Sequence, residues 1–236
     1  MEYFSGYIKK RRVNSAIRVS DTEWTSLGPA EGTANSAGRM LDIAFDPNND
    51  NIIWAGSASG GLWKSTNAGS SWNPVDDNLP SLAVGCIVTH NSSSDIIYIG
   101  TGEGMFNIDA VYGVGVLKST DGGSSWNTTG LSEQQSDYGA INEMVMHPTD
   151  ADILIAATKY GVYRTSDAGD TWTRTLNESS THEVVIDKVN PMLVYASAGY
   201  IWGSTDNGIY KSTDNPQIKR YNMTNRCIWR CCKIKI

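Results

Sequence analysis

The chain has 236 residues, of which 40% are hydrophobic, and a formal net charge of −6. Such an apolar content excludes a disordered chain, while 23 glycines, eight tryptophans and only 19% charged residues favour many short strands over packed helices. Both ends are basic, so residues 19–218 alone carry −16, a charge that repels nucleic acid and anionic lipid. We therefore expect an all-β protein that does not bind nucleic acid.

Export, membrane and disulfide signals are missing from the sequence. No window approaches the roughly 18 consecutive apolar residues of a membrane helix, and the N-terminus lacks the apolar stretch of a signal peptide. Three of the four cysteines, Cys227, Cys231 and Cys232, crowd a basic tail without paired zinc-site spacing. We predict no membrane insertion, no disulfide framework and no metal site.

The chain begins with a basic linker over residues 1–22. Residues 24–27 then have the shape of a short outer strand, although no strands that could pair with it precede them. In closed propellers the N-terminal segment often completes the last blade. We expect residues 24–27 to be such an orphan outer strand.

An eight-residue phrase, which we call the box, recurs at residues 65–72, 119–126 and 165–172. A fourth copy begins at Ser212 and breaks off after Asn215. The basic residues that precede the boxes are spaced 54, 46 and 47 residues apart, and this period is typical of one propeller blade. These cations are Lys64, Lys118, Arg164 and Lys211.

Three apolar segments precede the first box, at residues 40–45, 52–56 and 61–64, and the later units repeat this order. Four strands per period is the architecture of a propeller blade. We predict a partial β-propeller of about four four-stranded blades over residues 23–215, a fragment of a larger ring.

Each box has a mechanical interpretation. The Asp or Asn side chain bonds backbone N–H groups two residues on, Gly supplies a positive φ, and Ser or Thr caps the turn. The Trp that ends each box is interpreted as a wedge between blades, with sugar stacking as the alternative. The structural positions are Ser65, Asn67, Gly69, Trp72, Ser119, Asp121, Gly123, Trp126, Thr165, Asp167, Gly169, Trp172, Ser212 and Asp214.

Over residues 24–215 these units resemble the Asp-box (bacterial neuraminidase) repeats of sialidases, xyloglucanase-type glycosidases, sortilin-like receptor domains and a photosystem assembly factor. The segments that carry the resemblance are residues 24–29, 38–40, 58–65, 100–104 and 115–123. Within this group the chain is most similar to secreted sortilin-type propellers of Bacteroidota with a C-terminal sorting domain. The resemblance implies an extracellular or cell-surface location for the intact parent protein.

The resemblance implies a closed ring, because propellers with Asp-box repeats usually have six or more blades, whereas four units are present here. We therefore expect the remaining blades of the parent protein to be a partner. We expect residues 216–236 to form an aberrant, basic, Cys-containing tail that does not continue the blade. A shifted reading frame explains the tail, with a genuine membrane-surface or metal-binding tail as the alternative.

Candidate ligand-binding residues lie in the loops opposite the boxes. The long loop 101–112 mixes carboxylates with aromatic residues, which suits sugar, peptide or calcium. We predict no cofactor, with calcium as the alternative. The candidates are Glu103, Asp109, Tyr112, Tyr160, Tyr200 and Trp202.

A glycosidase needs two opposed carboxylates, for which Glu103 and Asp109 are weak candidates. The resemblance places Ala58 where xyloglucanase-type enzymes carry a catalytic aspartate. A sialidase needs a cluster of arginines to bind the carboxylate of sialic acid, and residues 19–218 contain three arginines. We therefore interpret the chain as a non-enzymatic propeller that recognises a glycan or a polypeptide; the alternatives are a glycoside hydrolase acting on polysaccharide and an assembly chaperone.

Overall fold

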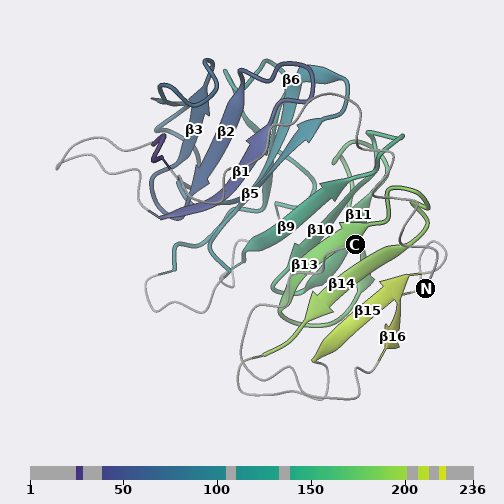
Figure 1. Ribbon diagram of the computed structural model, residues 1–236. Helices are drawn as coiled ribbons and strands as arrows, with labels where there is room; N and C mark the ends of the chain where they lie inside the picture. The colour runs from purple at the N-terminus through teal and green to yellow at the C-terminus, as the bar shows by residue number, and fades with distance from the viewer. Residues whose placement is uncertain are drawn as a thin grey trace.

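A computed structural model describes residues 25–28, 39–104, 110–132, 139–200, 207–212 and 218–221. These residues form 16 strands and no helix, arranged in four antiparallel four-stranded sheets (Figure 1). Consecutive sheets follow one another along the chain as the blades of a propeller. The predicted all-β fold of about four blades is confirmed. No helix in the described ranges has the length and apolar character needed to cross a membrane.

Within every blade the four strands are neighbours in chain order, so each sheet is a meander. Blade 1 contains β1 (Met40–Phe45), β2 (Ile53–Ser57), β3 (Leu62–Ser65) and β4 (Asn73–Pro74). Blade 2 contains β5 (Val84–His90), β6 (Ser93–Thr101), β7 (Val116–Ser119) and β8 (Asn127–Thr128). Blade 3 contains β9 (Ile141–Met146), β10 (Leu154–Thr158), β11 (Gly161–Thr165) and β12 (Thr173–Leu176). Blade 4 contains β13 (Thr181–Ile186), β14 (Val194–Ala198), β15 (Gly208–Ser212) and β16 (Ile218–Tyr221).

The core lies between the blades, because each sheet is apolar on both faces. One buried cluster joins Trp54 and Leu62 of blade 1 to Ile97 and Leu117 of blade 2. Equivalent clusters join blade 2 to blade 3 and blade 3 to blade 4. The second strands of blades 1 and 3 are therefore continuously buried: all five residues of β2 and all five of β10 are buried.

The face of blade 1 that points away from blade 2 is uncovered along β1, whereas Ala55 and Trp63 on the same face are buried beneath Trp72. Ile43 is 58% exposed and Phe45 is 59% exposed, whereas Ile87, which has the place of Ile43 in blade 2, is buried in the cluster between blades 1 and 2. Met144 and Val184 are buried in the same way in blades 3 and 4. Strand β1 thus presents an apolar face of the kind that a neighbouring blade covers elsewhere in the fold.

Residues 25–28 lie beside the first box. A Cβ built on Gly69 would approach Leu27 Cδ1 to 3.2 Å, much as a Cβ on Gly123 approaches Val75 and one on Gly169 approaches Thr129. Trp72 Nε1 also donates a hydrogen bond to Leu27 O over 2.8 Å. Leu27 therefore lies where the other boxes meet the outer segment of the preceding blade, although residues 25–28 are not assigned to a strand.

Strand β16 pairs with β15, so the prediction that the chain does not continue the blade after residue 215 is wrong for residues 218–221. The fourth hairpin nevertheless differs in register from the other three. Lys64, Lys118 and Arg164 each pair with the residue nine positions later, at Asn73, Asn127 and Thr173. Lys211 pairs with Lys219, eight positions later. Pro216 and Lys219 replace the glycine and the tryptophan of a complete box, so the hairpin that closes blade 4 is one residue shorter. Asp214 itself lies outside the described residues, as do residues 1–24 and 222–236.

Candidate functional site

The three complete boxes form nearly identical turns on one rim of the propeller. In the second box, Ser119 Oγ accepts a hydrogen bond from Gly123 N at 2.9 Å and donates one to Asp121 Oδ1 at 2.8 Å. The other two boxes repeat both bonds through Ser65 and Thr165. Gly123 has a φ of +89°, which glycine adopts at little cost. The side chains of each box therefore stabilise the backbone turn that the box itself forms.

The carboxylates of two boxes are strongly hydrogen-bonded. The hydroxyl and backbone N–H of Ser125, followed by the Ser119 hydroxyl, lower the pKa of Asp121 to about 2. The hydroxyls of Thr165 and Thr171 likewise lower the pKa of Asp167 to about 2. Asn67 accepts the bonds from the Ser65 hydroxyl and the Ser71 N–H without a charge and donates the third, to Ser71 Oγ, so the first box has no corresponding proton equilibrium.

A cross-strand pair in the preceding blade fastens the second and third boxes to that blade. Lys64 Nζ lies 4.5 Å from the centre of the Trp54 ring and donates to Gly122 O of the second box over 2.9 Å. At the next junction Lys118 Nζ lies 5.4 Å from the Tyr98 ring, and both side chains donate to Ala168 O over 3.0 Å. We call this arrangement of ring, cation and box carbonyl the latch.

The box tryptophans are half-buried rather than central to the core. Trp126 packs against the cluster between blades 1 and 2, and Trp172 against the cluster between blades 2 and 3. Trp72 packs on Ala55 and Trp63 of its own blade. The fully buried rings at the first two junctions are Trp54 and Tyr98, which the sequence analysis did not single out. Each ring lies directly opposite Lys64 or Lys118 in the strand register, but the separations in sequence are ten and twenty residues, so no fixed spacing marks them.

The opposite rim, which we call the loop rim, contains the loops between second and third strands. One backbone hydrogen bond ties each loop to the start of its blade's first strand: Ala58 to Arg39, Gly102 to Ala83, Lys159 to Ala140 and Gly199 to Ser180. The residue that follows the hydrogen-bonded N–H in each loop therefore occupies the same position in its blade. In blades 2, 3 and 4 these residues are Glu103, Tyr160 and Tyr200.

Glu103 is the buried charged residue of the loop rim. Its carboxylate forms an ion pair with Arg39 of blade 1, and the two side chains are 2% and 51% exposed. The backbone N–H of Glu103 donates to Val111 O over 2.9 Å, which ties the start of the long loop to its end. Because the ion pair spans two blades, Glu103 has a structural role in addition to any role in binding.

The tyrosines of the loop rim are accessible. Tyr112 is 54% exposed and Tyr200 is 36% exposed, while Tyr160 is half-buried with Lys159 Nζ 5.7 Å from its ring. Arg174 donates to Tyr160 O, and Asn207 bonds both the N–H and the carbonyl of Tyr200. These bonds fix the backbone that carries each ring. Asp109 and Trp202 lie outside the described residues.

Charge and metal-ligand geometry bear on the possible ligands. Among the residues that the structure describes, no three His, Cys, Asp or Glu side chains come together as a metal site.

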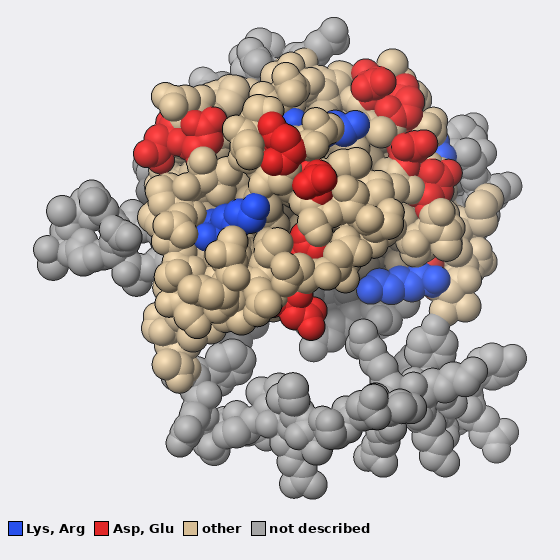
Figure 2. Space-filling view, turned by 90° about the horizontal axis from the view of Figure 1, so that it is seen from above, with Lys and Arg blue, Asp and Glu red and all other residues tan. Residues whose placement is uncertain are grey.

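The face seen in Figure 2 carries more acidic than basic side chains, in keeping with the charge of the blade region. Burial raises the pKa of the Cys86 thiol well above its usual range, so this cysteine is unreactive at neutral pH.

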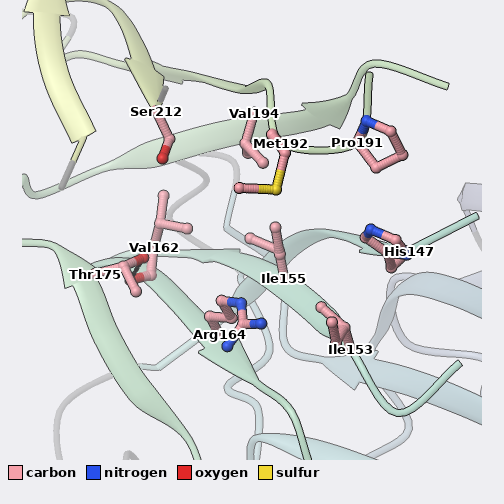
Figure 3. Close-up of a pocket in the computed structure, with 10 residues that line it drawn as sticks. All are labelled: His147, Ile153, Ile155, Val162, Arg164, Thr175, Pro191, Met192, Val194 and Ser212. Atoms are coloured by element: carbon pink, nitrogen blue, oxygen red, sulfur yellow. Dashed lines mark hydrogen bonds between the residues drawn. The ribbon is translucent and has the colours of Figure 1, made fainter. Parts of the chain in front are cut away.

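A cavity of about 100 Å³ lies between blades 3 and 4, on the box side rather than at the loop rim (Figure 3). Blade 3 contributes Ile155, Val162 and Arg164, and the turn and strands of blade 4 contribute Met192 and Val194. The cavity is therefore separate from the candidate residues of the loop rim.

No model of a known protein family matches the chain. A xyloglucanase from Paenibacillus sp is 27% identical over 186 residues, which cover 71% of this chain and 18% of that enzyme. The chain thus spans less than a fifth of the length of this curated relative.

Solved structures share the fold. An ancestral GH74 enzyme superposes with a TM-score of 0.60 and 24% identity over 86% of this chain and 26% of that one. A structure of YCF48 bound to a D1 peptide gives a TM-score of 0.52 and 16% identity over 77% of this chain and 54% of that one. At these identities the superpositions establish a β-propeller, a fold that supports several functions.

Proposed function

We propose that this chain is a non-catalytic section of a propeller that binds a β-glucan through its loop rim. The observation that carries the proposal is the equivalent placement of Glu103, Tyr160 and Tyr200 in three consecutive blades. Aromatic rings offer flat apolar faces for the C–H faces of sugar rings, and a carboxylate accepts hydrogen bonds from sugar hydroxyls. Such groups at regular intervals suit a chain of repeating sugar units.

Similarity to a xyloglucanase supports a xyloglucan-like polysaccharide as the ligand class. The test is retention of the full chain in native gels that contain xyloglucan, with gels containing unbranched β-glucan, pullulan or no polysaccharide for comparison. We expect retardation by xyloglucan and little by pullulan. Tyr200→Ala removes one ring and should weaken retention about tenfold, while Tyr200→Phe keeps the ring and should retain most of the binding. Equal mobility in every gel would refute the proposal.

The alternative function is hydrolysis of the polysaccharide, which the same relative favours. Ala58 supplies no carboxylate at the loop of blade 1, and Glu103 is engaged by Arg39. Reducing ends released from xyloglucan, and lost in Glu103→Gln or Asp109→Asn, would establish a hydrolase instead. Retention without release of reducing ends favours the binding role.

A polypeptide ligand is the third outcome, because one structural neighbour was solved with a bound peptide. Recovery of defined proteins by the immobilised chain, displaced by no polysaccharide, would favour it. Wild-type and Tyr200→Ala chains should be compared in the same pull-down, since binding elsewhere on the surface would not respond to this substitution.

The parent protein is proposed to act outside the cell, where β-glucans are found, with its repeats of the Asp-box type seen in sortilin-like propellers. Ile43 and Phe45 on β1 are the surface on which a further blade would pack. Co-expression with the neighbouring coding sequence tests whether a further blade packs on β1. Such a blade should protect the β1 amides from hydrogen exchange.

A further inference from the structure

At the strand position that Trp54 and Tyr98 occupy at the other two junctions, the junction between blades 3 and 4 has no ring, although Tyr210 of β15 is buried elsewhere in the same cluster. Trp54, Tyr98 and Tyr195 each lie opposite a cation in the strand register, at Lys64, Lys118 and Lys211 respectively. In each pair the Lys Nζ lies 4.5–5.6 Å from the ring centre. In blade 3 the same register pairs Arg164 with Ile155. Arg164 is thus the one cation of the four that has an aliphatic residue in place of the ring.

The cavity lies at this substitution. Figure 3 shows Met192 pointing from the blade 4 side toward Ile155, with Arg164 at the lower edge. Its walls are largely aliphatic, from Ile155, Val162, Val194 and Met192. Polar groups border it at Ser212, Thr175 and His147. An enclosed apolar cavity of about 150 Å³ admits benzene; the present cavity is smaller but opens to solvent beside Met192, so part of a larger ring stays outside it.

Met192 also departs from the pattern of the other blades. Residues Asn51 and Asp152 stand at its position in blades 1 and 3, where their carbonyls accept hydrogen bonds from Ala68 N and Ala168 N of the box turns. Met192 is 54% exposed and unbranched, and methionine side chains adapt to aromatic rings. The cavity therefore has a flexible apolar cover on the solvent side.

We propose that the cavity between blades 3 and 4 is a binding site for a small planar aromatic molecule of about the size of indole. The ring takes the place that Trp54 and Tyr98 have at the other junctions. The Arg164 guanidinium lies against its face, and Ile155, Val162, Val194 and Met192 surround its edge. The site lies on the box side, so it is independent of glycan binding at the loop rim.

The binding test uses indole as the probe and the full chain. Titration is followed by the 13C-labelled methyl group of Met192, which is assigned by its loss in Met192→Leu. A bound ring should move this signal by its ring current, whereas the other methionine methyls should move little. No movement of the Met192 signal up to the solubility limit of indole overturns the proposal.

Two variants test whether indole binds in this cavity. Ile155→Tyr supplies the ring that blade 2 carries at this place and should abolish the response to indole while raising the thermal midpoint. Ile43→Tyr adds the same ring on the exposed face of β1 and should leave the response unchanged. An unaltered response in folded Ile155→Tyr would show that indole binds elsewhere.

The role of Arg164 is tested separately, so that the proposal does not depend on one variant folding. Arg164→Met keeps the length of the side chain and removes its charge. It should weaken indole binding about fivefold, within the range of cation–π interactions. Cyclohexanol, which lacks a π face, should bind more weakly than indole to the wild type and equally to the wild type and Arg164→Met. Equal indole affinities for both chains would contradict a stacked ring.

Discussion

The two rims of this propeller are built from different kinds of residue. On the box rim, chemically similar side chains recur in every complete blade, and they bond to one another or to the neighbouring blade. On the loop rim, the backbone hydrogen bonds recur, but the side chains beyond them change from serine to glutamate to tyrosine. Repetition therefore marks the residues that pack blades together, and variation marks those available for recognition.

The loop rim still depends on the box rim for its geometry. Each first strand begins at the loop rim and ends near the box rim, so a box that shifts would displace the loop of its own blade. Substitutions on the two rims therefore separate packing from recognition.

The largest effect is expected at Gly123. A Cβ at this residue would lie 2.7 Å from Trp54 Cη2, and the φ of +89° adds backbone strain. Gly123→Ala should lower the free energy of unfolding by about 3 kcal/mol, combining overpacking with strain. Gly69→Ala is the matched control, because φ is +86° but the nearest atom is Leu27 Cδ1 at 3.2 Å.

Denaturant unfolding of both variants measures the difference. Gly69→Ala should cost about 1 kcal/mol, the strain alone. If both substitutions cost the same, the fit of Gly123 against Trp54 does not fasten the second box.

A smaller effect is expected where the loop rim itself contributes to packing. Arg39→Met leaves the buried Glu103 carboxylate without its cation and should cost about 1–2 kcal/mol, less than a fully buried pair because Arg39 is half-exposed. Arg39→Met with Glu103→Gln should recover part of this loss in a double-mutant cycle. Additive losses would mean that the ion pair contributes nothing to stability.

The smallest effect is a pH dependence confined to the box rim. The pKa values of Asp121 and Asp167 are about 2 in the folded chain, below the value near 3.9 of an unfolded aspartate. Their contribution to stability is therefore complete above about pH 4 and is lost as the pH falls through about 2. Asp121→Asn with Asp167→Asn should flatten the loss of stability over this range. Thermal midpoints that fall equally in both chains would contradict this assignment.

Much of the fold could be predicted from the sequence because the box recurs at a blade-length period. The strands, their order and the number of blades follow from that repetition. The latch was missed because it joins residues of different strands and blades: Lys64 reaches Gly122, 58 residues away, and no local pattern records this distance.

The loop rim was harder to predict for a physical reason. Glu103, Tyr160 and Tyr200 differ in chemistry, so their equivalence is visible only through the backbone bonds that tie the loops to the first strands. The Arg39 partner of Glu103 belongs to another blade. The cavity between blades 3 and 4 depends on an absent ring, and the substitution of Ile155 for an aromatic residue becomes meaningful only when the register is known.

Xyloglucan retention by a pair of loop-rim variants tests the central claim most directly. Tyr160→Ala with Tyr200→Ala removes two rings from consecutive blades, Tyr160→Phe with Tyr200→Phe keeps them, and Asn67→Ala alters the box rim alone. The account predicts that the double alanine variant is no longer retarded by xyloglucan, although its thermal midpoint is nearly unchanged. The double phenylalanine variant and Asn67→Ala should be retarded like the wild type. Wild-type retention by the double alanine variant would contradict it.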